Sequence, residues 1–217
     1  MPVWVGVPED ARAIVTQCTG LQEPPQGPFN EAWLVCGRRA GKSFILALIA
    51  VYIAAFRDYS DALTAGERGT IMVIAADRKQ ARTILRYIRG LLGVPILAKL
   101  VERETADAFD LDNHVTIEIG TASIRSVRGY TIVAALADEL AFWPSENSSS
   151  PDYEILDSIR PGMATVPGSM LLCASSPYAR RGALHDAYKR YFGKPDAPVL
   201  VLLSQILFAC LKLRIGR

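Results

Sequence analysis

Near its amino end the chain reads Cys36-Gly37-Arg38-Arg39-Ala40-Gly41-Lys42-Ser43. An apolar run from Trp33 to Cys36 leads into this segment and predicts a strand, and a run from about Lys42 to Phe56 predicts a helix. Glycines in such a turn let several backbone N–H groups point at phosphate oxygens, beside the positive end of the helix dipole. The spacing matches the phosphate-binding loop G-x-x-x-x-G-K-[ST], except that Cys36 takes the place of the first glycine. In such a loop Lys42 would contact the β- and γ-phosphates of ATP and Ser43 would bind Mg²⁺.

The Gly41-Lys42-Ser43 triplet by itself is not specific, because it also occurs in surface turns. The preceding strand, the following apolar helix and a second glycine at position 37 favour the phosphate loop. We expect the nucleotide to be bound by Gly37, Arg38, Arg39, Ala40, Gly41, Lys42 and Ser43.

Continuous apolar runs later in the chain predict the rest of a buried sheet. They cover Thr70–Ala76, Thr131–Ala137 and Met170–Ala174, and runs of this length are typical of parallel strands covered on both faces. The helix from Lys42 to Phe56 is apolar almost all round, so we expect it to be buried against this sheet. Strands that alternate with helices indicate a doubly wound α/β fold, here a P-loop NTPase of the ASCE type with three αβα layers and a mostly parallel central sheet.

Two further elements are predicted between these strands. Asp77 can cap a helix that continues to about Leu92 and stops at Gly93. Val115 to Ile119 alternates between apolar and polar residues and is predicted to form a hairpin with Ser123 to Val127.

The strand predicted at Thr131–Ala137 ends in Asp138 and Glu139. Ligands of open α/β sheets bind at the carboxyl ends of the strands, so both carboxylates would lie at the edge that carries the phosphate loop. We expect Asp138 to hold the Mg²⁺ shell and Glu139 to polarise the attacking water. The alternative is that the two acids only cap the following segment.

Two further groups are candidates for the same reaction. Ser175 and Ser176 follow the last buried strand and can hydrogen-bond the catalytic water or Glu139, unless they form an ordinary strand-to-loop turn. Arg128 precedes the acidic strand, so it would lie at the far end of that strand from Asp138 and could serve the nucleotide site of a neighbouring subunit. The alternative is a simple surface arginine.

The charge balance excludes an argument for nucleic acid from bulk electrostatics. The chain has 217 residues with 24 basic and 22 acidic side chains, a net charge of +2, so nucleic-acid binding would need a local basic patch. The arginines of one candidate patch, on one helix face and a later loop, are Arg78, Arg82, Arg86, Arg89, Arg180 and Arg181. The alternative is a solvated helix face.

Cysteine usage and hydropathy favour a cytoplasmic protein. The four cysteines, Cys18, Cys36, Cys173 and Cys210, show no paired spacing and predict reduced thiols. The first residues lack the basic and apolar regions of a signal peptide. The longest apolar run, Phe44 to Phe56, is shorter than the ~20 residues that span a bilayer, so no contact with a membrane is expected.

Taken together, four segments closely resemble the large terminase subunit of tailed bacteriophages. They are Gly37–Ser43, Ser126-Val127-Arg128-Gly129, Leu136-Ala137-Asp138-Glu139-Leu140-Ala141-Phe142-Trp143 and Cys173-Ala174-Ser175-Ser176-Pro177-Tyr178. The resemblance covers roughly residues 20–198, and a loop that starts without glycine is usual in that family. It implies an ATP-hydrolysing motor domain that moves double-stranded DNA through the portal protein into a procapsid. It also implies a homo-oligomeric ring on the procapsid, a small terminase subunit as partner, and a monomer for the isolated chain.

The same resemblance implies a role for each matching residue. In chain order, Arg38 acts in its own site, Lys42 and Ser43 bind ATP and Mg²⁺, Arg128 is the arginine finger for the next subunit, Asp138 is the Walker B metal residue, Glu139 is the catalytic carboxylate, and Ser175 and Ser176 form the coupling motif. Gln22 or Gln26 is a weak match for the family's adenine-contacting glutamine.

The resemblance divides the chain into a leader (1–32), an ATPase domain (33–198) and a tail (199–217). Members of the family carry a nuclease domain with acid-ligated metals, whereas this tail contains no Asp or Glu. We therefore expect no nuclease activity, and we interpret the chain as truncated or as the product of a decayed prophage gene, with an aliphatic tail that suggests an out-of-frame end.

Two other functions stay open. One is a helicase-like P-loop ATPase that acts on nucleic acid, although Phe142-Trp143 and the single-domain length argue against it. The other is a defective remnant that binds nucleotide without motor activity.

Overall fold

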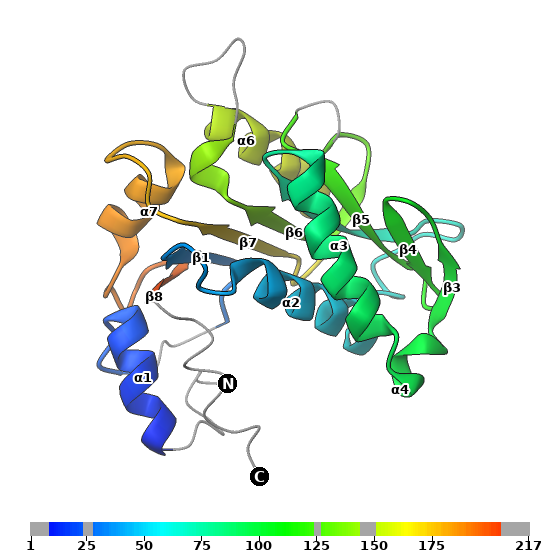
Figure 1. Ribbon diagram of the computed structural model, residues 1–217, viewed down its shortest axis with the longest axis horizontal. Helices are drawn as coiled ribbons and strands as arrows, with labels where there is room; N and C mark the ends of the chain where they lie inside the picture. The colour runs from blue at the N-terminus through cyan, green and yellow to red at the C-terminus, as the bar shows by residue number, and fades with distance from the viewer. Residues whose placement is uncertain (1–8, 24–27, 124–126, 144–150, 205–217) are drawn as a thin grey trace.

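Eight strands form one sheet in the order β3-β4-β5-β2-β6-β7-β1-β8 (Figure 1). The computed structural model describes residues 9–23, 28–123, 127–143 and 151–204. The strands are β1 (Glu31–Cys36), β2 (Gly69–Ala75), β3 (Val101–Glu104), β4 (Ala108–Leu111), β5 (Val115–Thr121), β6 (Thr131–Asp138), β7 (Met170–Ser175) and β8 (Leu200–Ser204). Neighbours from β5 to β8 pair in parallel, and β3 and β4 add an antiparallel edge. The predicted doubly wound, mostly parallel α/β sheet is confirmed.

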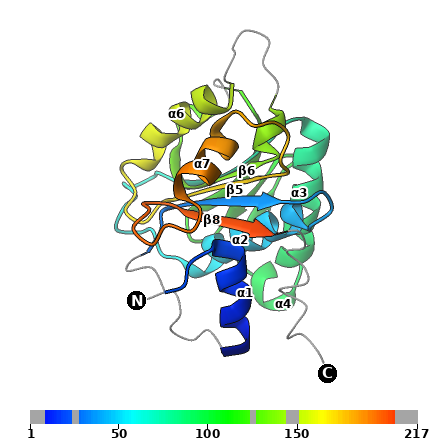
Figure 2. The same ribbon diagram turned by 90° about the vertical axis from the view of Figure 1, so that its left-hand side faces the viewer.

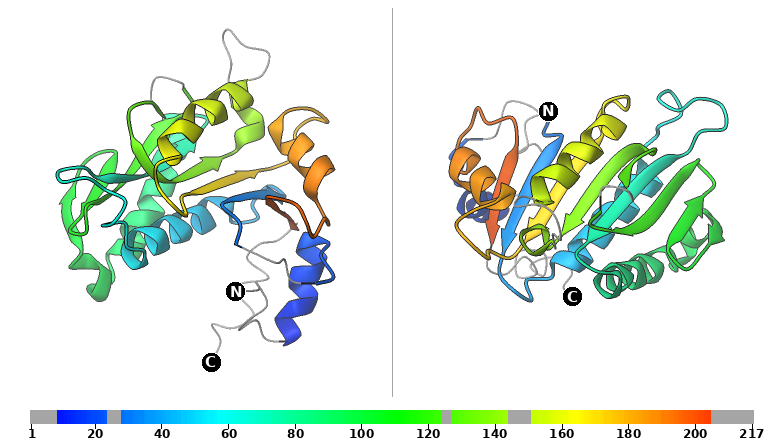
Figure 3. Two further views of the ribbon diagram at one scale, coloured as in Figure 1. Left: turned by 180° about the vertical axis from the view of Figure 1, so that it is seen from behind. Right: turned by 90° about the horizontal axis from the view of Figure 1, so that it is seen from above.

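Helices cover both faces of this sheet, which gives the three predicted layers (Figure 3). The helices are α1 (Glu9–Thr19), α2 (Lys42–Phe56), α3 (Arg78–Leu92), α4 (Pro95–Ala98), the short 3₁₀ helix η1 (Leu140–Phe142), α6 (Pro151–Met163) and α7 (Ala183–Tyr191). Successive residues of β1 face opposite layers: Leu34 packs with α2 and α3, whereas Trp33 and Val35 pack with α6 and α7. Helix α1 packs against β8 at the edge of the sheet (Figure 2).

Helix α2 is less buried than its apolar sequence predicts. Leu48, Tyr52 and Phe56 recur every fourth residue and are exposed, and Phe56 reaches 66%. The sheet and α3 contact the other faces of α2, and this row is left to solvent among the described residues. The prediction that this helix is buried against the sheet is confirmed, and one row of apolar side chains on its outer face remains exposed.

The hairpin predicted from Val115–Ile119 and Ser123–Val127 is wrong. Both edges of β5 are already paired, with β2 in parallel and with β4 in antiparallel. The antiparallel partner precedes β5 instead of following it, and residues 124–126 lie outside the described part of the chain. Strands β3 and β4 were not predicted from the sequence. Each is only four residues long and carries charged side chains such as Glu102 and Asp110, so neither forms an apolar run.

The sheet includes β8, which begins after residue 198, and residues 205–217 lie outside the described part of the chain. Among the described residues, no helix combines the length and the hydropathy that a bilayer span requires. Cys36 and Cys173 are free thiols.

A glycine near the end of α6 allows this helix to approach the start of β6. A Cβ atom on Gly162 would lie 2.7 Å from the carbonyl oxygen of Tyr130. We expect Gly162→Ala to lower the free energy of unfolding by about 1–3 kcal/mol, because the backbone must shift to relieve the overlap. Gly90→Ala in α3 is the matched control: nothing lies within 4 Å of the added Cβ, and a gain of about 0.5–1 kcal/mol is expected. Urea denaturation of both variants measures the difference, and equal stabilities would contradict the tight packing at Gly162.

Candidate active site

Three neighbouring strands deliver the predicted site residues to one edge of the sheet. β7 lies between β6 and β1, and all three run in parallel. In the strand register, Asp138 pairs with Ala174 and Val35 pairs with Ser175. The carboxyl ends of β6, β7 and β1 therefore lie side by side. This edge is where open α/β sheets bind their ligands.

The segment that follows β1 has the backbone geometry of a phosphate loop. Gly41, immediately before α2, has a φ of 85°, and Arg39 has a φ of 61°. Positive φ angles are easy for glycine and turn the backbone sharply, which lets the N–H groups at the start of α2 remain available to an anion. At the first loop position, burial raises the pKa of the Cys36 thiol to about 11, so this side chain is a neutral packing group.

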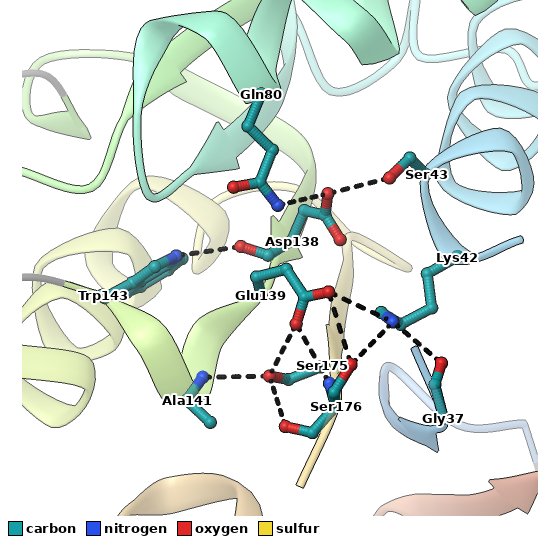
Figure 4. A network of polar contacts seen from close by, with 10 residues as sticks. All are labelled: Gly37, Lys42, Ser43, Gln80, Asp138, Glu139, Ala141, Trp143, Ser175 and Ser176. Atoms are coloured by element: carbon teal, nitrogen blue, oxygen red, sulfur yellow. Dashed lines mark hydrogen bonds and ion pairs between the residues drawn. The ribbon is translucent and has the colours of Figure 1, made fainter. Parts of the chain in front are cut away.

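Lys42 lies at the centre of a polar network (Figure 4). The ammonium group donates to the carbonyl oxygen of Gly37 at 3.2 Å and to Oγ of Ser176 at 3.0 Å. It also forms an ion pair with Glu139, with 3.1 Å between Nζ and Oε1. The side chain of Lys42 is only 5% exposed, so the network holds this charge at the mouth of the loop.

Asp138 is fully buried at the end of β6. Its Oδ2 accepts hydrogen bonds from Ser43 Oγ at 3.1 Å and from Gln80 Nε2 at 3.0 Å, whereas Oδ1 is buried without a partner among the described residues. Burial raises the pKa of the Asp138 carboxyl above its ordinary value, and the hydrogen bond from Gln80 opposes this shift. A buried carboxylate oxygen without a donor is costly unless something else binds it. Asp138 and Ser43 therefore fit the oxygen ligands that Mg²⁺ prefers.

Glu139 adopts the left-handed conformation, with a φ of 50°, directly after β6. This turn directs its carboxylate toward β7, where Oε2 accepts the backbone N–H of Ser176 at 3.1 Å and lies 3.3 Å from Ser175 Oγ. The backbone N–H of Ala141 donates to the same Ser175 hydroxyl at 3.1 Å. The indole of Trp143 donates to the carbonyl oxygen of Asp138 at 3.0 Å and fixes the bend.

The structure therefore brings together seven of the predicted residues: Gly37, Lys42, Ser43, Asp138, Glu139, Ser175 and Ser176. The predicted arginines lie elsewhere. Arg38 is exposed on the loop, and Arg128 is exposed three residues before β6 begins, on the amino side of the sheet. Their predicted roles stay predictions.

The candidates for the adenine contact are not near this network. Gln22 is exposed and follows Gly20, which packs against Gly193 beyond the end of α7. Because α7 runs back from the carboxyl edge of the sheet, its end lies toward the amino edge, away from the phosphate loop. Gln26 lies outside the described residues.

Gln80, which was not predicted as a site residue, contacts Asp138 from the first turn of α3. Its position could have been noticed, because Asp77 and Gln80 have the spacing of a capping box. Asp77 does cap α3, with Oδ1 accepting the backbone N–H of Gln80 at 2.9 Å. The side chain of Gln80 turns to Asp138 instead of back to the cap.

The candidate basic patch on α3 is divided by ion pairs. Arg78 binds Asp107 at 2.8 Å and Arg89 binds Glu104 at 2.6 Å, both from the segment of β3 and β4. Arg82 and Arg86 are exposed. All four arginines of the predicted stripe are exposed. Arg78 and Arg89 are paired with carboxylates, whereas Arg82 and Arg86 form no ion pair with a described residue.

The strand order, the loop and the residues around Lys42 and Asp138 define the fold of a P-loop NTPase. Comparison with solved structures finds the same fold in terminases of bacteriophages. The chain matches the HK97 bacteriophage large terminase with a TM-score of 0.62 and 16% identity, over 92% of this chain and 39% of that one. It matches the large terminase ATPase domain of Thermus phage P74-26 with a TM-score of 0.58 and 15% identity, over 82% of this chain and 77% of that one.

A mutant of the P74-26 domain matches with a TM-score of 0.54 and 16% identity, over the same shares of both chains. The protein therefore has the fold of phage large terminase ATPase domains. It spans about two fifths of the length of the HK97 protein, since 39% of that chain is covered. No protein-family model and no curated protein matches the sequence.

Proposed function

We propose that this chain is the ATP-hydrolysing motor domain of a viral DNA-packaging terminase, which moves double-stranded DNA into a procapsid. The observation that carries the proposal is the convergence of Lys42, Ser43, Asp138 and Glu139 at one edge of the sheet. The likeness to terminase ATPase domains supports the choice of this motor among P-loop proteins.

Bound Mg²⁺ and ATP would supply the phosphoanhydride bond and neutralise charge on its oxygens. Ser43 and Asp138 would hold the metal ion. The N–H groups of the loop and the ammonium group of Lys42 would bind the phosphates. Glu139 would orient the attacking water and accept its proton.

The contacts of Lys42 suggest how nucleotide binding and Glu139 are linked. In the structure, Lys42 is paired with Glu139 and hydrogen-bonded to Ser176. A triphosphate would compete for the same ammonium group, and Glu139 would then be released toward the water. Glu139 also accepts a hydrogen bond from the N–H of Ser176, so a movement of Glu139 would change this contact at the end of β7. This contact supports a coupling role for Ser175 and Ser176.

The first test is nucleotide binding and hydrolysis by the purified chain. We expect Mg²⁺-dependent ATP hydrolysis, and we expect Lys42→Ala to lose both binding and turnover, because the loop loses its charge for the phosphates. A folded chain that neither binds nor hydrolyses ATP would contradict the proposal. The remnant hypothesis predicts an insoluble chain or binding without turnover.

A second test separates a terminase from a helicase-like ATPase. We propose the portal protein and the small terminase subunit as partners, and a homo-oligomeric ring on the procapsid in the cytoplasm of the bacterial host. Stimulation of ATP hydrolysis by DNA would fit either class. Binding to a portal or small-terminase protein in a pull-down with purified components supports the terminase, and hydrolysis without such binding supports the helicase-like class.

Arg82 and Arg86, the two arginines of the α3 stripe that form no ion pair with a described residue, are our candidates for DNA backbone contacts. We expect Arg82→Glu with Arg86→Glu to weaken DNA binding equally for all sequences and to reduce the slope of log affinity against log salt by about 2, since each lost phosphate contact removes ~0.9. Filter binding over a salt series measures this slope. Arg78→Glu is the matched control, because Arg78 is already neutralised by Asp107. An unchanged slope in the double variant would show that these arginines do not contact DNA and belong to an ordinary solvated helix face.

A further inference from the structure

Gln80 is a polar group within the network that none of the recognised motifs contains. It comes from α3, a helix that contains none of the predicted phosphate-binding or acidic residues (Figure 4). Its amide nitrogen donates to Oδ2 of Asp138 at 3.0 Å. The two residues are 58 positions apart, so this contact exists only because β2 and β6 are neighbours in the sheet.

The backbone of Gln80 is fixed as firmly as its side chain. Asp77 caps α3 by accepting the N–H of Gln80 at 2.9 Å, two residues after β2 ends. A side chain whose Cα is held by a helix cap has less freedom to leave its partner. The amide of Gln80 is thus presented to Asp138 by the rigid junction between β2 and α3.

The two oxygens of the Asp138 carboxylate have different surroundings. Oδ2 accepts from both Gln80 and Ser43, whereas Oδ1 is buried and unpaired among the described residues. In Figure 4 the unpaired oxygen lies on the side of Lys42. Of the two donors, Ser43 is itself a proposed metal ligand, and Gln80 has no other task in the site.

We propose that Gln80 is a positioning residue for the metal-binding carboxylate, which holds Oδ2 so that Oδ1 remains directed at Mg²⁺. This inference rests on the proposed function. Outer partners that orient a ligating carboxylate typically change metal affinity by ~10–100-fold when they are removed. Gln80 therefore contributes to Mg²⁺ binding without touching the metal ion or the nucleotide.

The test compares the full chain with Gln80→Met, which keeps the length of the side chain and removes the donor. A fluorescent ATP analogue is titrated with and without Mg²⁺. We expect Gln80→Met to bind the analogue without Mg²⁺ as the parent does, and to lose about 10–100-fold of the gain in affinity that Mg²⁺ provides. In hydrolysis assays, the Mg²⁺ concentration for half-maximal rate should rise, while the rate at saturating Mg²⁺ falls less.

Two controls separate positioning from a general loss of structure. Lys79→Met alters an exposed neighbour on the same helical turn and should leave the Mg²⁺ dependence unchanged. In an Asp138→Asn background, Gln80→Met should have no further effect on that dependence, because the carboxylate that it orients is gone. The inference is overturned if Gln80→Met has the Mg²⁺ dependence of the parent. It is also overturned if Gln80→Met reduces the Mg²⁺-dependent gain in affinity as much in the Asp138→Asn background as in the parent. Failure of the parent chain to bind the analogue at all would overturn the proposed function instead.

Discussion

Replacing Glu139 by Gln is expected to leave ATP binding intact and to lower turnover by about 10²–10⁴-fold, the usual contribution of a positioned general base. Gln has the same shape, so the hydrogen bond from the N–H of Ser176 can persist, but an amide cannot accept the proton of the attacking water. The substitution also removes the negative partner of Lys42. The affinity for nucleotide should therefore stay the same or rise, because the phosphates no longer have to displace a carboxylate from the ammonium group of Lys42.

The measurement is a pair of assays on one preparation, with equilibrium binding of a fluorescent ATP analogue beside steady-state release of phosphate. Glu102→Gln is a matched control, since Glu102 is an exposed carboxylate on β3 that pairs with Arg68. Turnover of Glu139→Gln at the parental rate would show that another group is the base. Loss of binding together with turnover would show that Glu139 organises the loop.

The second large effect concerns Arg128, which we expect to act on the site of a neighbouring subunit. Thr131 and Asp138 stand at opposite ends of β6, ~23 Å apart at ~3.3 Å per residue, and Arg128 precedes Thr131. Arg128 is exposed on the amino side of the sheet, whereas the proposed metal-binding residues lie on the carboxyl side. Arg128→Ala should therefore reduce the rate of an assembled ring by about 10³–10⁵-fold, or ~4–7 kcal/mol of barrier, while a dilute monomer is slow with or without it.

Mixing two inactive variants tests this directly. Glu139→Gln chains retain Arg128, and Arg128→Ala chains retain Glu139, so some interfaces of a mixed ring contain one intact site. ATP hydrolysis should reappear in the mixture under conditions that force assembly, with oligomeric state checked by light scattering. Arg103→Ala is the control for loss of a surface arginine, since Arg103 pairs with Asp110 at the antiparallel edge. No recovery in a demonstrably assembled mixture, or full activity of a dilute monomer, would count against Arg128 acting between subunits.

Much of the fold could be predicted because the sequence patterns that indicate it consist of consecutive residues. The loop from Cys36 to Ser43 occupies consecutive positions, and the runs that form β2, β6 and β7 are uninterrupted. The start of α2 and both ends of α3 were also predicted, from Lys42, the cap at Asp77 and the last residue Leu92. Local sequence is enough for these elements, because a strand, a cap or a glycine turn depends on neighbouring residues.

The features that could not be predicted are those in which an element's surroundings come from distant parts of the chain. The exposed row on α2 depends on how far α3 and the sheet reach around that helix. The partners of β5 depend on two short charged strands without a periodic signal. The division of the arginine stripe follows from carboxylates of Asp107 and Glu104, which the fold of that edge brings to α3.

The candidate site could likewise be predicted only in part. Residue identity and order were sufficient to select Lys42, Asp138 and Glu139, because chemistry of this kind needs particular groups at the ends of successive strands. Only the tertiary structure could add Gln80 to Asp138 and pair Lys42 with Glu139, because these contacts join residues 58 and 97 positions apart (139 − 42 = 97). A hydrogen bond or ion pair requires atoms within a few ångströms, and strand order in the sheet, which no local pattern encodes, decides which distant side chains meet that condition.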